Sequence, residues 1–283
     1  MKRNPSHFID QLISELQLRN YSPRTIHTYG VLLSNVEKFF NKSIDQVTSN
    51  EVKHFLLERI NKESLSVSSI NQYISAYKLL QIDVLGREWE PVRIKRPRRV
   101  KKLPVVLSVG EVERLIGVTQ NIKHKAILML AYSSGLRRQE LQQILPGAID
   151  SALMQVHVVQ GKGKKDRYTI LSSKTLETLR WYYKHQRPAH FLFEAQGQKG
   201  KSLSDSTLNS IVKKAAVKAG VKKKISFHTL RHCFATHLLE KGVNLRLIQQ
   251  FMGHVSLKTT AGYLHLVTVN PASVVSPLDS MNV

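Results

Sequence analysis

A basic, proline-containing segment divides this chain of 283 residues into two parts. It runs from residue 93 to residue 104, and seven of its twelve residues are Lys or Arg. Pro97 and Pro104 prevent a regular helix across it, because proline lacks the backbone N–H that a helix uses. The chain is long enough for two domains. We therefore expect a first domain over residues 1–90, a linker over 91–104 and a second domain over 105–283.

The first part has the pattern of a small helical domain. Ser22 followed by Pro23 is typical of a helix start, with serine as the N-cap and proline in the first helical position. Thr48 and Glu51 form a capping box, and apolar residues recur at helical spacing after both starts. A further helix is expected over 69–80. This part contains no catalytic grouping.

The second part combines helices with one β-hairpin. A capping box from Ser108 to Glu111 precedes a helical pattern. Between 153 and 171 apolar and polar residues alternate on either side of a basic, glycine-containing tip at 161–166. The fold class is therefore mainly α, with an α+β second domain that holds a small antiparallel sheet. After the hairpin, helices are expected near residues 173–186, 204–219, 227–241, 244–252 and 256–267.

The charge balance indicates a polyanionic partner. The sequence holds 43 Lys and Arg against 20 Asp and Glu, a formal net charge of +23. Such an excess repels itself unless an anion compensates it, and nucleic acid is the commonest such anion. A basic enzyme of another kind and a protein that binds an anionic membrane surface are the alternatives.

The cations of the linker are interpreted in the same way. We favour a strap that lies along a phosphate backbone, and the alternative is a solvated charged segment. The residues concerned are Arg93, Lys95, Arg96, Arg98, Arg99, Lys101 and Lys102.

Three further features limit the class of protein. No apolar run approaches the roughly 20 residues that span a bilayer, and no apolar segment of a secretory signal follows Lys2 and Arg3. Cys233 is the single cysteine, which excludes an intramolecular disulfide and a cysteine-based zinc site. We expect a buried thiol rather than a reactive one. These features suit a cytoplasmic protein.

Arg137 is the first candidate for anion binding. The pattern predicts a helix that Ser133 or Ser134 caps, with Arg137 near the centre of its apolar face. A cation near a helix N-terminus is costly, because the helix dipole is already positive there. It needs an anion, which is either Glu140 one turn along or an external ligand. In a combination of the two, Glu140 orients Arg137 while the remaining donors face a phosphate.

His228 and Arg231 repeat this arrangement in a later helix. Ser226 is the expected N-cap, which places both side chains on one face near the N-terminus. The alternative is that both are simply exposed on a basic surface. Gly253 is expected to end the next helix, so that His254 follows a sharp turn.

Tyr263 lies nine residues after His254 and is either a nucleophile or an ordinary core residue. Metal catalysis is disfavoured, because this half of the chain has few acids and no His-Glu-x-x-His pattern. A zinc site built from His228, His232 and His237 lacks a suitably spaced ligand set. We expect no metal and no cofactor.

Taken in order, these residues resemble the tyrosine recombinases, the phage-integrase and Xer-like family. Residues 131–141 match an A-x-x-S/T-G-L-R-x-x-E-L box, and residues 161–167 match a hairpin G-K-G-x-K-x-R pattern. Residues 228–238 match H-x-L-R-H-x-F-A-T-H-L, and residues 252–254 match the L-G-H box that precedes the tyrosine. The resemblance covers most of the chain, because the first part is similar to the family's helical core-binding, SAM-like domain.

The resemblance implies a role in phosphate chemistry for several residues. Tyr263 would attack the scissile phosphate and form a 3′-phosphotyrosine. Arg137 and Arg231 would bind the non-bridging oxygens, and His254 would add a hydrogen bond to them. Glu140 is expected to support Arg137 from behind.

The resemblance also implies how protons move. Lys162 would protonate the leaving 5′-hydroxyl, and His228 would assist proton transfer with the nucleophile. Lys164 and Lys165 at the hairpin tip are expected to contact DNA. The sequence departs from the family at Gly262, which should weaken the helix expected over 256–267 by about 1 kcal/mol relative to alanine.

We therefore expect a site-specific DNA recombinase or integrase that needs neither metal nor ATP. It would act as a homotetramer on paired double-stranded DNA sites, associated with the nucleoid. A type IB topoisomerase-like nicking-closing enzyme and a DNA-binding protein without catalysis are the alternatives. The order of the motifs argues against the first, and the complete set of six catalytic residues argues against the second.

Overall fold

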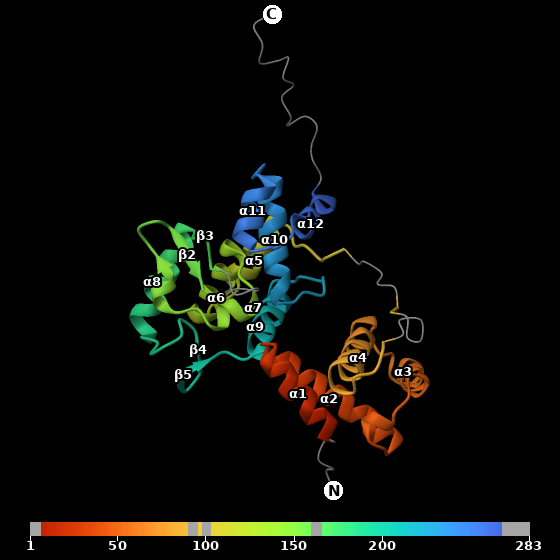
Figure 1. Cartoon of the computed structure of the whole chain (residues 1–283). Helices are drawn as coiled ribbons and strands as arrows, with labels where there is room; N and C mark the ends of the chain where they lie inside the picture. Colours follow the sequence, from red (N-terminus) through yellow and green to blue (C-terminus); the bar gives the residue numbers. More distant parts are fainter. Residues whose placement is uncertain (1–6, 90–95, 98–102, 160–165, 268–283) are drawn as a thin grey trace, which may run out of the picture. The chain divides into compact units, whose positions relative to one another are not determined.

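The computed structural model describes residues 7–89, 96–97, 103–159 and 166–267. Its contacts divide the chain into two compact units, residues 1–101 and residues 102–283. Red to orange colours mark most of the first unit in Figure 1, and yellow-green to blue mark the second. Among the described residues, no helix combines the length and the apolar character needed to cross a membrane.

The first unit is helical, as the sequence predicts. The side chains of Ser22, Thr48 and Ser66 cap its helices by accepting hydrogen bonds from backbone N–H groups. Glu51 completes the predicted capping box, and the apolar faces of the helices share one core. The elements are α1 His7–Leu18, α2 Pro23–Phe40, the short η1 Ile44–Gln46, α3 Ser49–Glu63, α4 Val67–Leu79 and the π-helical η2 Leu80–Val84.

Arg96 is the linker cation that lies within the described residues. Its guanidinium donates hydrogen bonds to the backbone oxygen of Asn71 at 3.3 Å and to Oγ of Ser75 at 3.0 Å, both on α4. The side chain is thus held against the first unit. The strap along DNA stays a prediction, and its other members, Arg93, Lys95, Arg98, Arg99, Lys101 and Lys102, lie outside the described residues.

The second unit places helices around a small antiparallel sheet (Figure 1). Its core includes α6, α8, α9 and α10 together with the inner side of the sheet. In chain order the elements are α5 Val109–Gly117, α6 Ile122–Ser134, α7 Arg138–Gln142, η3 Pro146–Ala148, β1 Ile149–Asp150, β2 Gln155–Val158, β3 Arg167–Ile170, α8 Ser173–Gln186, β4 Glu194–Ala195, β5 Gln198–Ser202, α9 Asp205–Lys218, α10 Phe227–Glu240, α11 Leu245–Met252, α12 Leu257–Ala261 and η4 Leu264–Leu266.

The predicted β-hairpin is confirmed. Strands β2 and β3 pair antiparallel, from Gln155 opposite Ile170 to Val158 opposite Arg167. The sequence did not predict that β1 adds a third strand beside β2, nor that β4 and β5 form a separate antiparallel pair. The tip at residues 160–165 lies outside the described residues.

Cys233 is buried in α10, as predicted. Its Sγ accepts a hydrogen bond from the backbone N–H of Leu107 at 3.2 Å. Burial raises the pKa of the thiol to about 11. The thiol therefore stays protonated at neutral pH and has a structural role.

The helix predicted around Arg137 begins later than expected. Ser133 and Ser134 end α6 instead of capping a new helix, and Gly135 follows with a φ of 60°. Helix α7 starts at Arg138, with Arg137 as its N-cap residue and Glu140 closing a capping box. The prediction was wrong because Gly135, with its left-handed backbone, separates the two helices, although the spacing of the apolar residues alone suggests one helix from Ser134 onward.

The helix expected over 256–267 is also interrupted. Helix α12 ends at Ala261, and η4 is a separate 3₁₀ turn. Gly262 is the C-cap residue of α12 and not an interior helical residue, so the expected cost of a helical glycine does not apply. Tyr263 lies between the two turns and is buried.

We expect Gly135→Ala to destabilise the second unit by about 3 kcal/mol, because alanine is strained at positive φ and its Cβ would overlap the ring of Phe234. The added Cβ would lie 2.3 Å from Phe234 Cδ1. Gly220→Ala is the matched control. Gly220 has a φ of 66° with open space around an added Cβ, so about 1 kcal/mol is expected there. Urea unfolding followed by Trp181 fluorescence in a Trp89→Phe background measures both, and equal losses would contradict the packing argument.

Candidate active site

Arg231 is a fully buried cation on α10, with 1% of its surface exposed. Its guanidinium donates hydrogen bonds to the backbone oxygens of Gly135 and Met252 and, at 3.2 Å, to Nε2 of His254. Burial, and then the charge of Arg137, lowers the pKa of Arg231 to about 9, so it remains charged at neutral pH. The alternative of an arginine simply exposed on a basic surface is therefore excluded for Arg231.

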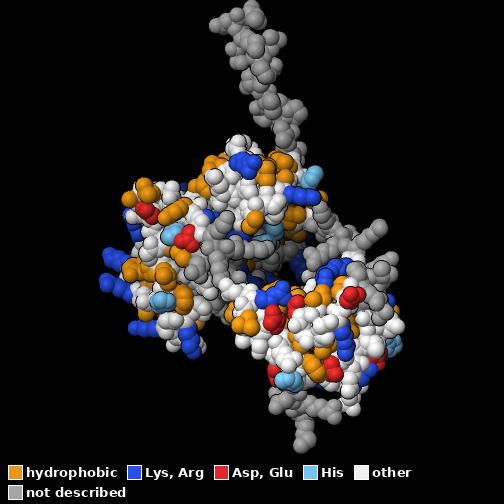
Figure 2. Space-filling model, viewed as in Figure 1, with side chains coloured by type: hydrophobic (Ala, Val, Ile, Leu, Met, Phe, Trp, Pro, Cys, Tyr) orange, Lys and Arg blue, Asp and Glu red, His pale blue; other side chains and the backbone are white. Residues whose placement is uncertain are grey.

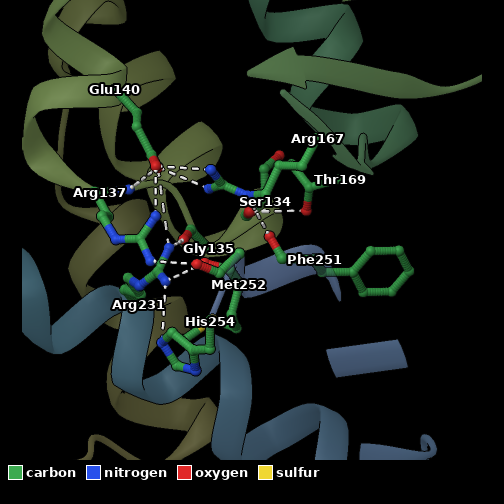
Figure 3. Close-up of polar contacts among 11 residues, drawn as sticks. Ser134, Gly135, Arg137, Glu140, Arg167, Thr169, Arg231, Phe251, Met252 and His254 are labelled. Atoms are coloured by element: carbon green, nitrogen blue, oxygen red, sulfur yellow. Dashed lines mark hydrogen bonds and ion pairs between the residues drawn. The ribbon is translucent and has the colours of Figure 1, made fainter. Parts of the chain in front are cut away.

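Glu140 joins two further arginines (Figure 3). Its Oε1 accepts hydrogen bonds from Arg137 at 2.8 Å and from Arg167 at 2.7 Å. Its Oε2 accepts from Arg167 at 2.7 Å and from the backbone N–H of Arg137 at 2.6 Å. Arg137 also donates to the backbone oxygen of Gly253 at 2.8 Å. The ion pair between Arg137 and Glu140, one of the alternatives that the sequence offered, thus exists. It does not use all the N–H donors of the Arg137 guanidinium.

Three guanidinium groups, those of Arg137, Arg167 and Arg231, form what we call the guanidinium cluster. Arg231 lies 4.0 Å from Glu140, while the other two bond to it directly. Burial by itself raises the pKa of Glu140, but the hydrogen bond and charge of Arg167, and then those of Arg137, outweigh it and lower the pKa to about 2. Three cations thus face one ionised carboxylate. This excess of positive charge favours the binding of an anion.

A turn at Gly253 brings His254 to the guanidinium cluster. Gly253 has a φ of 58°, and an added Cβ would lie 2.7 Å from Cδ of Arg167, so a larger residue would strain the backbone and displace the Arg167 side chain. His254 Nε2 accepts from Arg231, and its Nδ1 lies 2.9 Å from Oγ1 of Thr260. Because arginine can only donate, the proton of His254 is on Nδ1. Burial, and then the charge of Arg231, lowers the pKa of His254 to about 3, which keeps the ring neutral.

Tyr263 places its hydroxyl beside a second imidazole. Its Oη lies 2.9 Å from Nδ1 of His232, and its ring is parallel to that of His254 with centroids 6.3 Å apart. Burial raises the pKa of the phenol, and the charges of Arg231 and Arg137 oppose this effect. The ring also packs in an apolar cluster with α11. The ring of Tyr263 is therefore part of the core, while its hydroxyl contacts a polar side chain of the site.

His228 lies in the first turn of α10, with Ser226 as the N-cap, as predicted. Its side chain is exposed, and its ring is perpendicular to that of His232 with centroids 4.6 Å apart. The imidazole that contacts the phenol is that of His232. Three lysines at the hairpin tip, Lys162, Lys164 and Lys165, lie outside the described residues. Their expected roles stay predictions.

The sequence assigned no role to Arg167 or His232. Arg167 stands at the end of a matched motif, but it lies 27 positions after Glu140 in the sequence. Helical spacing does not predict a contact between residues so far apart. His232 directly follows Arg231, and consecutive helical residues point about 100° apart. Only the packing of the segment around Tyr263 against α10 shows that the side chain of His232 also faces the site.

His237 is engaged at both ring nitrogens. Its Nδ1 lies 2.9 Å from Oη of Tyr132, and its Nε2 lies 2.9 Å from the backbone oxygen of Leu107. This arrangement leaves no lone pair for the zinc site considered from His228, His232 and His237. Within the described part of the chain, no three His, Cys, Asp or Glu side chains are grouped to hold a metal ion.

Comparison with known proteins assigns both parts of the chain to one family. The model of the phage integrase family matches residues 106–268, and that of the phage integrase N-terminal SAM-like domain matches residues 8–91. The putative integrase/recombinase y4qK of Sinorhizobium fredii is 36% identical over 95% of this chain and 87% of its own. Tyrosine recombinase XerA of Pyrococcus horikoshii is 33% identical over 93% of this chain and 90% of its own.

Solved structures share the architecture. The crystal structure of XerA recombinase aligns with a TM-score of 0.55 at 27% identity, over 94% of both chains. XerH recombinase bound to its difH substrate aligns with a TM-score of 0.71 at 22% identity, over 90% of this chain and 81% of the other. A helical domain followed by a mixed domain with a phenol beside clustered arginines defines a DNA strand-exchange class. The chain belongs to the phage integrase family and is a tyrosine recombinase.

We expect Glu140→Gln to destabilise the second unit by about 3 kcal/mol at pH 7, because the buried Arg167 loses its ionic partner. The folded-state pKa of about 2 lies below the model value of 4.5. The contribution of Glu140 is therefore complete above pH 4.5 and is lost as the pH falls toward 2. Unfolding free energies between pH 7 and pH 3 should show the difference between wild type and variant shrinking.

Glu111→Gln is the matched control for this experiment. Glu111 occupies the same capping-box position in α5, but its cationic partner, Lys223, is 45% exposed. A loss of at most about 1 kcal/mol is expected. If both variants lost the same stability, the guanidinium cluster would have no special importance for the fold.

Proposed function

We propose that this tyrosine recombinase cleaves and rejoins DNA at specific sites through a 3′-phosphotyrosine intermediate, without metal or ATP. The observation that carries the proposal is the guanidinium cluster next to a buried phenol. Three cations around one carboxylate leave positive charge for a phosphate, and Tyr263 supplies a nucleophilic oxygen. The phosphotyrosine retains the energy of the broken phosphodiester, so that religation needs no ATP.

Arg137 and Arg231 would hold the non-bridging oxygens, where negative charge grows in the transition state. His254 would join them in a second protonation state. In the free site its Nε2 accepts from Arg231, but a bound phosphate raises the pKa of a neighbouring imidazole. The ring would then gain a proton and donate to the phosphate.

Lys162 would protonate the leaving 5′-oxygen, with His228 assisting proton transfer at the nucleophile. The 5′-hydroxyl of a partner duplex would then attack the phosphotyrosine and release Tyr263. This second attack reverses the first, so the same residues serve both steps.

The DNA would be held by charge along its backbone. XerH was solved bound to its difH substrate and lambda integrase bound to a COC′ core site, and we infer a double-stranded recombination site for this chain. The linker strap, Lys164 and Lys165 would contact phosphates nearby. Figure 2 shows Lys and Arg side chains gathered where α8 and the β4–β5 pair lie, which adds to the general attraction.

A homotetramer on two paired sites, associated with the nucleoid, would carry out the exchange. A topoisomerase-like enzyme would use the same residues as a monomer and relax supercoiled DNA. Incubation of the protein with a plasmid that carries two sites separates the two: recombined products support the proposal, and relaxation without recombination supports the alternative.

We expect Tyr263→Phe to abolish covalent capture of a nicked suicide substrate while DNA affinity changes less than about twofold, because the lost hydroxyl is the nucleophile and not a binding anchor. Denaturing gels measure the covalent adduct, and mobility shifts measure binding. An adduct formed by the variant would show that another residue attacks the phosphate.

DNA binding should weaken steeply as the salt concentration rises. Each phosphate contacted should contribute about −0.9 to the slope of log K against log salt. The Arg98→Gln/Arg99→Gln double variant should reduce the magnitude of that slope by about 2. Lys213→Gln/Lys214→Gln, a pair exposed on α9, is the matched control of equal charge change. An unchanged slope in the linker variant would contradict the strap.

A further inference from the structure

We infer that His232 is the general base that takes the proton of Tyr263 during DNA cleavage. The inference rests on the proposed function and revises one part of it, because it gives to His232 the proton transfer at the nucleophile that the proposed function gives to His228. It departs from the role that the family resemblance implies for His228, and it starts from the contact between Tyr263 Oη and His232 Nδ1 at 2.9 Å.

The distance and the position of this contact suit proton transfer. A base must lie within about 2.6–3.2 Å of the oxygen that it deprotonates. His232 is partly buried on α10, directly after Arg231. Arg231, proposed to bind the phosphate, and the base therefore stand on neighbouring residues of one helix, and the phenol reaches the base from the segment between α12 and η4.

The protonation states on the two sides of the hydrogen bond are complementary. Burial, and then the charges of His228 and Arg231, lowers the pKa of His232 to about 4, so its ring is neutral. Burial raises the pKa of Tyr263, so its phenol is protonated. The phenol then donates to Nδ1, and the proton of the imidazole is on Nε2.

The other two imidazoles near the phenol are less suited to this role. His254 stacks on the ring of Tyr263, but its Nε2 accepts from Arg231 and its Nδ1 bonds to Thr260. His228 is exposed and contacts the ring of His232. It thus adjoins the base.

The step balances without any further reactant. Oη of Tyr263 attacks the phosphorus, the O–P bond to tyrosine forms, and the bond from phosphorus to the 5′-oxygen breaks. The phenolic proton moves to Nδ1 of His232, which becomes an imidazolium, while the 5′-oxygen receives its proton from the general acid of the proposed function. During religation His232 returns the proton to the leaving tyrosine.

The test begins with DNA that the protein itself selects. Duplexes that the wild-type chain captures covalently are isolated from a pool of nicked random duplexes and used for single-turnover capture. His232→Asn is the informative variant, because an amide preserves a polar group near the position of Nδ1 but cannot accept a proton at neutral pH. We expect its capture rate to fall by about 100-fold or more.

His265→Asn is the matched control. His265 is an exposed imidazole two residues after Tyr263, and its replacement should leave the capture rate within about twofold, as expected of a surface position. Thermal unfolding of both variants, and His232→Gln as a second substitution, show whether a loss of rate comes from a loss of fold.

Acidifying the nucleophile separates a base from a positioning residue. A ring-fluorinated tyrosine at position 263 has a more acidic phenol, which needs less help from a base. It should restore at least about tenfold of the rate lost in His232→Asn while changing the wild-type rate little. A folded His232→Asn chain that keeps the wild-type rate, or one whose loss fluorination does not repair, would overturn the inference.

The proposed function fails in a different way. If the wild-type chain captures no duplex, or captures it equally well as Tyr263→Phe, the phosphotyrosine mechanism itself is wrong. Capture that requires Tyr263 but not His232 leaves the proposed function intact and removes only the base assigned here.

Discussion

The second unit depends on the ion pairs between Glu140, Arg137 and Arg167. Glu140 belongs to α7, Arg167 opens β3, and Nε of Arg167 also donates to the backbone oxygen of Phe251 near the end of α11 at 2.8 Å. The pair of Glu140 and Arg167 thus joins three segments that lie far apart in the chain. Because Glu140 is 7% exposed and both of its oxygens are used, the arginines are oriented before any substrate arrives.

The guanidinium cluster has more positive charge than Glu140 neutralises. Arg231 is buried among backbone oxygens and lies next to two other cations. Such a site is tolerated because each guanidinium has partners, yet its excess charge remains. A phosphate would compensate that charge, and in the proposed mechanism the phenol of Tyr263 would attack it. Stability and chemistry therefore draw on one cluster.

Local signals predicted the helical first unit, the capping boxes at Thr48 and Ser108 and the β-hairpin, because each depends on residues close in sequence. They failed where a distant contact decides the backbone. Gly135 breaks the predicted helix with a φ of 60°, and the ring of Phe234 fills the space that a Cβ at this position would need. The helix expected around Tyr263 is divided, because that segment bends to pack on α10 and α11.

The sequence by itself determined the family, the order of the residues proposed to bind and attack the phosphate, and the expectation that Arg137 needs an anion. Tertiary structure decided which groups meet. It placed Arg167 on Glu140 and His232 on Tyr263, because these contacts arise when β3 and the last helical turns pack against α7 and α10. Spacing along one helix gives direction only within that helix, and a contact between two elements is set by how their surfaces pack.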